Sequence, residues 1–176
     1  MEDFSPGDTL ERGEPEDFSS VVPSNATTDE IETFTTGSCH WLSVALHRLH
    51  GWPILLVLDG EVMHWQDPTE DDAIPAVVHA YALSPDGMVW DVHGSRPVGD
   101  VRDEAEQRWR VGAYFTQIMR DEADLAEYVG CWGEDSEGEI IERPLPEYSE
   151  EDIEAVKAII PRILPEALPE RSGPRR

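Results

Sequence analysis

The fold is decided first by the stretch Cys39–Leu58, which reads CHWLSVALHRLHGWPILLVL. Apolar residues recur at helical spacing through its first half and predict a helix with one buried face. Gly51 is a natural helix terminator and Pro53 prevents the helix from continuing. The apolar run Ile54–Leu58 then predicts a buried strand, so the stretch indicates a helix packed on a sheet.

A second stretch, Val77–Asp91, reads VVHAYALSPDGMVWD and predicts a strand, a turn and a second strand. If Pro85–Gly87 is a three-residue loop, His79 and Asp91 lie on one face as diagonal neighbours. A two-residue loop would turn Asp91 to the other face. Three-residue loops that end in glycine are common, so we expect the register that brings His79 and Asp91 together.

The order Cys39, His79 and Asp91 suits thiol chemistry. A helix N-terminus stabilises a thiolate, the reactive form of cysteine, and its free N–H groups can bind an oxyanion. A histidine on a neighbouring strand can take the thiol proton, and an aspartate can fix the imidazole tautomer. We therefore predict Cys39 as nucleophile, His79 as base and Asp91 as orienting residue.

The motifs Gly37-Ser38-Cys39, Leu49–Pro53, His79-Ala80-Tyr81 and Trp90-Asp91, with the Pro-Asp-Gly turn, resemble the core of transglutaminase-like enzymes of the papain fold. The resemblance covers about residues 37–94. It implies an α+β fold, in which a helix carrying the cysteine packs on a small antiparallel sheet, and the same three catalytic residues. No upstream glutamine is found for the oxyanion hole, so Ser38, Thr36 or a backbone amide would replace it.

The function expected from this resemblance is that of a cysteine-dependent hydrolase or acyltransferase acting on amide bonds, such as a peptidase, deamidase or transglutaminase-like enzyme. Its substrate would be a protein or peptide, and no cofactor or metal is implied. The alternative is a non-enzymatic acidic interaction protein, of phage or mobile-element type, that binds a basic partner.

The charge of the chain is extreme, with 38 acidic residues against 13 basic ones and a formal net charge of -25. Such a surface repels the phosphates of nucleic acids and anionic membranes. The sequence has no apolar run of membrane-spanning length, and its acidic start, Met1–Phe4, does not resemble a secretory signal. We expect a cytoplasmic protein with no structural disulfide between Cys39 and Cys131.

Three regions are expected along the chain: an acidic flexible arm over residues 1–36, an α+β domain over 37–146, and a C-terminal helix with a proline-rich tail over 147–176. High charge with few apolar groups predicts the flexible arm. Within the domain, the pattern of Val101–Val129 predicts helix, and Gly130–Pro146 predicts a loop with one short strand.

Two sets of histidines leave metal binding open as a weaker alternative. His40, His47 and His50 share one helical face, but no further ligands accompany them at suitable spacing. A mixed set would join His79, His93 and Asp91 with Cys39.

Overall fold

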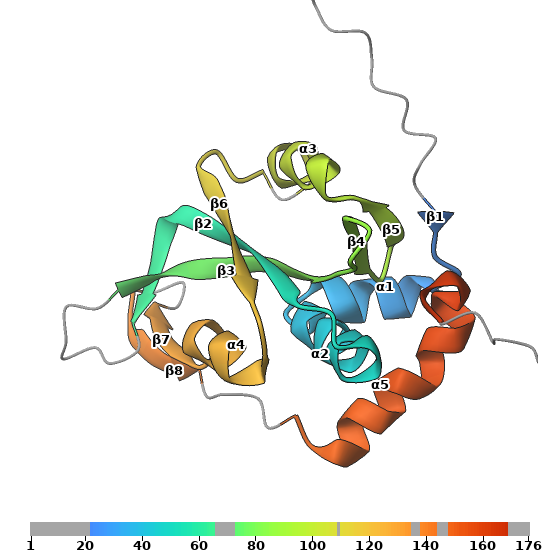
Figure 1. The fold of residues 1–176 in the computed structure, drawn as a ribbon. Coiled ribbons are helices and arrows are strands. Elements are labelled where there is room, and N and C mark those ends of the chain that lie inside the picture. The colour runs from blue at the N-terminus through green and yellow to red at the C-terminus, as the bar shows by residue number, and fades with distance from the viewer. Residues whose placement is uncertain (1–21, 66–72, 109, 135–137, 144–147, 169–176) are drawn as a thin grey trace, which may run out of the picture.

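The computed structural model describes residues 22–65, 73–108, 110–134, 138–143 and 148–168. It is an α+β fold in which helices cover both faces of an antiparallel sheet (Figure 1). The strands follow the order β1-β5-β4-β3-β2-β7-β8, and β6 also pairs with β2. Their bounds are β1 Val22–Pro23, β2 Ile54–Trp65, β3 Ala73–Leu83, β4 Met88–Asp91, β5 Gly94–Pro97, β6 Tyr114–Met119, β7 Cys131–Glu134 and β8 Ile140–Arg143.

The helices divide between the two faces of this sheet (Figure 1). Helices α2 and α4 pack against one face, with α1 and α5 packed on α2 at the same side, and α3 packs against the other face. Their bounds are α1 Thr28–Thr35, α2 Cys39–His50, α3 Val101–Gln107, α4 Glu122–Val129 and α5 Glu150–Ile163, with short 3-10 turns η2 Val98–Asp100 and η3 Pro165–Ala167. Among the helices of the described ranges, none could span a lipid bilayer.

The larger core lies between the sheet and α2. Leu42 and Leu46 of α2 meet Leu56 of β2, and Ile153 of α5 closes the same cluster. All four side chains are buried, and burying each contributes about 2 kcal/mol. Helix α2 ends as predicted: Gly51 adopts the left-handed conformation at φ 70° and donates its N–H to the carbonyl of His47.

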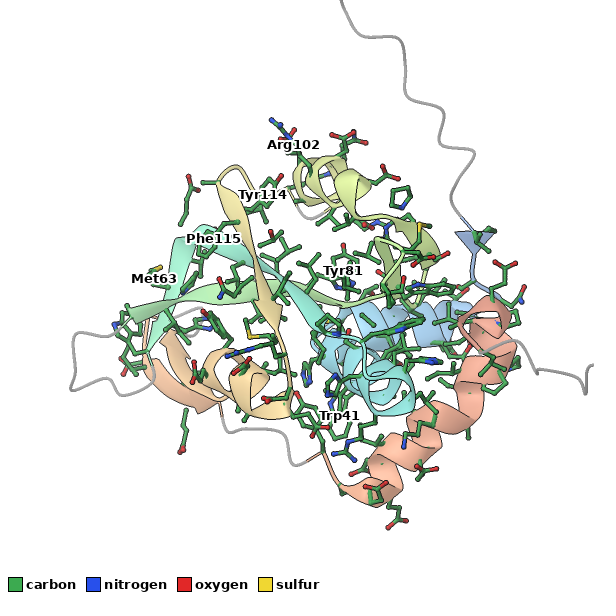
Figure 2. The ribbon with its side chains drawn as sticks, viewed as in Figure 1. Trp41, Met63, Tyr81, Arg102, Tyr114 and Phe115 are labelled. Atoms are coloured by element: carbon green, nitrogen blue, oxygen red, sulfur yellow. The ribbon has the colours of Figure 1, made fainter. Side chains whose placement is uncertain are left out.

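The smaller core lies under α3, on the opposite face of the sheet. Leu55 and Val57 of β2 and Tyr81 of β3 pack there against Val101 and Ala105 of α3. Tyr81 points from β3 towards α3 (Figure 2). Because alternate residues of a strand face opposite sides, β2 contributes to both cores.

The terminal segments join the larger core. Helix α1 begins with the capping box of Thr27 and Glu30 and buries Phe34 beside α2, while the predicted C-terminal helix is α5, capped by Ser149. Residues 22–36, expected in the acidic arm, thus pack against the domain. Residues 1–21 of that arm lie outside the described residues, as do the last residues of the proline-rich tail.

The helical pattern predicted over Val101–Val129 is wrong in its middle. Strand β6 separates α3 from α4, and it pairs with Ile54–Asp59 of β2. The free edge of a buried strand supplies backbone partners that local periodicity does not reveal. The residues after Gly130 form two strands, β7 and β8, instead of one.

Candidate functional site

The site is organised by the hairpin of β3 and β4, whose register is the one expected from the sequence. Ala82 pairs with Trp90 and Leu83 with Val89, and the Ser84 N–H donates to the carbonyl of Met88. The loop therefore spans Pro85–Gly87, with Gly87 at φ 83°. This register continues to bring His79 and Asp91 to one side of the hairpin.

His79 follows an irregular point in β3. Val57 of β2 pairs with His79, whereas the next residue, Leu58, pairs with Val77, so Val78 is an extra residue in β3. Such bulges turn a side chain away from the regular alternation of a strand. Strand β3 pairs with β4 at Ala82 and Leu83, so His79 lies beyond the part of β3 that pairs with β4, although it still pairs with Val57 of β2.

His79 and Asp91 form a buried pair. The Nε2 atom of His79 lies 2.9 Å from Oδ2 of Asp91, and the two side chains are 0% and 3% exposed. This bond leaves Nδ1 as the ring nitrogen available to Cys39, which also interacts with His79. Burial opposes protonation of His79, but the hydrogen bonds to Asp91 and Cys39 outweigh it and raise its pKa to about 9.

Cys39 begins α2, as predicted, and is 7% exposed. It belongs to the core on the α2 side of the sheet, whereas Tyr81, the ring neighbour of His79, belongs to the core under α3. His79 therefore connects the two sides. The structure brings together all three residues that the sequence singled out.

The neighbour of Cys39, His40, is fixed by two hydrogen bonds. Its Nε2 lies 3.0 Å from the Gly37 carbonyl, which can only accept, so Nε2 carries the proton. Nδ1 then accepts from the Tyr148 hydroxyl at 2.8 Å. Burial lowers the pKa of His40, which is only partly offset by the bond to Gly37, so this ring is neutral at pH 7.

Tyr148 packs over the N-terminal turn of α2. Its ring makes edge contacts with His40 and Trp41, at 5.6 and 5.1 Å between ring centres, and Trp41 lies between α2 and the start of α5 (Figure 2). Burial, the nearby Cys39 and Glu122 together raise the pKa of Tyr148 above its usual range. Arg48 holds the segment in place by donating to the Tyr148 carbonyl at 3.0 Å.

Asp91 is held from behind by Arg96, a residue that the sequence analysis did not single out. The guanidinium donates to both carboxylate oxygens, each at 3.0 Å, and the His93 N–H donates to Oδ1 at 2.9 Å. Burial would raise the pKa of Asp91, but the bonds to His79 and Arg96 dominate and lower it far below its usual range. A sequence signal existed, because the two-residue turn Val92-His93 places Arg96 on the same face as Asp91.

The histidine sets considered for metal binding do not form a metal site. No group of three or more histidine, cysteine, aspartate or glutamate side chains in the described ranges is arranged to hold a metal ion. His40 is turned to Gly37 and Tyr148, and Nδ1 of His47 bonds the Trp52 carbonyl at 2.7 Å. His79 is instead held by Asp91.

Comparisons with known proteins add no family to this geometry, because no family model, curated protein or solved structure matches the chain. The site therefore has to be interpreted from its own chemistry.

Proposed function

We propose that the protein is a cysteine-dependent hydrolase or acyltransferase that acts on amide bonds of a protein or peptide, with a papain-like or transglutaminase-like core. The observation that carries the proposal is the buried contact of His79 with both Asp91 and Cys39. A raised pKa keeps His79 protonated at neutral pH, and an imidazolium beside a helix N-terminus favours the thiolate of Cys39.

The reaction would proceed in two steps. The thiolate sulfur attacks the amide carbonyl carbon, the C–N bond breaks, and the His79 imidazolium gives its proton to the leaving amine. A thioester then links the acyl group to Cys39. Water or a second amine, deprotonated by His79, attacks the thioester, and the sulfur leaves as thiolate while His79 is again protonated.

Asp91 has a supporting role in these steps. Its bond to Nε2 fixes the imidazole with Nδ1 towards the sulfur and stabilises the imidazolium. The backbone N–H groups of the first turn of α2 are the candidate donors to the oxyanion. Cys39 is 7% exposed and interacts with the nearby Tyr148, so we expect the substrate to approach the sulfur beside Tyr148.

The experiment is alkylation of Cys39 by iodoacetamide at pH 6.5, in a Cys131→Ser background so that a single thiol reports. We expect His79→Gln to slow the alkylation by about tenfold or more, because the thiolate loses its imidazolium partner. The matched control is His47→Gln. His47 lies on the same helix as Cys39, and its replacement should leave the alkylation rate unchanged.

Turnover is then tested by incubating the chain with a peptide library and following chain cleavage and ammonia release by mass spectrometry. Products should form with the wild type and be absent with Cys39→Ser. Equal alkylation rates in wild type and His79→Gln, together with no Cys39-dependent product, would overturn the proposal.

A further inference from the structure

The buried pair of His79 and Asp91 is the inner end of a longer chain of charges. Arg96 on β5 binds Asp91 with two hydrogen bonds and contacts Glu104 of α3, with Nε and Nη2 at 2.7 and 2.5 Å from Oε2. Arg108 pairs with the other oxygen of Glu104. From outside to inside, the charges alternate as Arg108, Glu104, Arg96, Asp91 and His79.

The burial of this chain makes each charge dependent on the next. Arg96 and Asp91 are 8% and 3% exposed and Glu104 is 9% exposed at the side chain, whereas Arg108 is 43% exposed. An uncompensated charge in such surroundings is costly, so each member requires its neighbours. Tyr81 completes the arrangement: its hydroxyl donates to Glu104 at 2.9 Å, and its ring contacts both His79 and the Arg96 guanidinium.

Arg96 and His79 share the Asp91 carboxylate as their hydrogen-bond acceptor. Oδ2 accepts from His79 at 2.9 Å and from Arg96 at 3.0 Å, so the same oxygen serves both cations. A positive charge on Arg96 weakens the hold of Asp91 on the His79 proton. Glu104 has the opposite effect, because its negative charge reduces the field of Arg96.

We propose that Arg96, clamped between Asp91 and Glu104, is a positioning residue that fixes the Asp91 carboxylate against His79 and tempers its charge, so that His79 can both keep and release its proton. The inference rests on the proposed function, which gives the His79 proton its role in catalysis. Without Arg96, Asp91 would hold the His79 proton more tightly, so that His79 would still assist the first step but would deprotonate water or an amine less readily in the second.

The groups that face His79 come from several elements of the fold. The ionisable side chains that contact His79 are Cys39 from α2, Tyr81 from β3 and Asp91 from β4. Those that surround Asp91 and Tyr81 in turn are His93 from the turn after β4, Arg96 from β5 and Glu104 from α3. Burial lowers the pKa of His93, so that ring is neutral, and Arg96 and His79 are the cations that contact Asp91.

The test is the titration of His79 by NMR in protein labelled with ¹³C and ¹⁵N histidine. Arg96→Gln should move its midpoint upwards by about one pH unit and Glu104→Gln should move it downwards by a similar amount. Arg96→Lys keeps the charge and should stay near the wild type. A merely structural role would move both neutral variants towards the ordinary value of 6.5.

Circular dichroism and thermal unfolding of each variant identify any that fail to fold. If Arg96→Gln fails, Arg108→Gln takes its place, because removing this partly exposed positive charge beside Glu104 should also move the His79 midpoint upwards, whereas a merely structural role would not. Equal midpoints in wild type and Glu104→Gln, or a downward move in folded Arg96→Gln, would overturn the inference. The midpoints are measured without substrate. If the two neutral variants shift in opposite directions but the protein shows no enzymatic turnover, the role of Arg96 is supported and only the proposed function fails.

Discussion

The Nε2 atom of His79 lies 2.9 Å from Oδ2 of Asp91, at a place where neither side chain meets solvent. The two residues come from different strands and are joined by a hairpin whose three-residue loop sets the register. Their contact links the thiol of α2 to the charges beneath α3.

The stability of the protein should fall as the pH rises through the titration of His79. The pKa of this histidine is raised from 6.5 to about 9 on folding, so its stabilising contribution is complete below 6.5 and is lost as the pH passes 9. Urea unfolding at pH 6 and pH 9 should show that the stability advantage of wild type over His79→Gln shrinks with pH. A constant difference would mean that His79 has no raised pKa in the folded state.

Replacement of Asp91 by asparagine should cost about 3 kcal/mol or more of unfolding free energy, because it leaves Arg96 buried without its main counter-charge. The double variant Asp91→Asn with Arg96→Met removes both charges and should recover part of that loss. Urea unfolding at pH 7 measures both. If the double variant is as unstable as the sum of the two single ones, the two side chains are not energetically coupled.

Removal of the Tyr148 ring should open the route to the Cys39 sulfur. In Tyr148→Ala, we expect iodoacetamide to alkylate Cys39 several-fold faster, because removal of the ring exposes the buried sulfur to the reagent. Phe115→Ala provides the control, since this side chain is 45% exposed on β6 and is absent from both cores. A rate equal to that of the control would show that Tyr148 does not restrict access.

Gly94 is required by the close approach of β1. It adopts φ +117°, and a Cβ atom there would lie 1.9 Å from the Val22 carbonyl oxygen. Gly94→Ala should cost about 2 kcal/mol and detach β1, which hydrogen exchange at Ser24 would report. Gly99→Ala is the matched control, because nothing lies within 4 Å of its added Cβ, and it should exchange like the wild type.

Local sequence patterns were enough to predict several elements of this structure. The apolar spacing after Cys39, the stop at Gly51 and the run from Ile54 were sufficient to predict α2 and β2, because each rests on short-range chemistry. The Pro-Asp-Gly loop was sufficient to predict the register that aligns His79 with Asp91. The mixture of helices and an antiparallel sheet was predicted for the same reason.

The features that the sequence analysis did not predict depend on contacts between residues far apart in the chain. Strand β6 shows no strand-like alternation of buried and exposed residues, since Phe115 and Ile118 are 45% and 51% exposed, and only the edge of β2 makes it a strand. Tyr148 reaches His40 across 108 residues of chain, and no spacing rule covers such a distance.

The sequence by itself therefore determined the helix that begins at Cys39, the hairpin, and the three residues brought together there, because these depend on neighbours in the chain. Only the tertiary structure decided what surrounds them. It placed Arg96 and Glu104 behind Asp91 and Tyr148 over Cys39, because buried charges and ring contacts are satisfied by whichever segments the packed sheet and helices bring close.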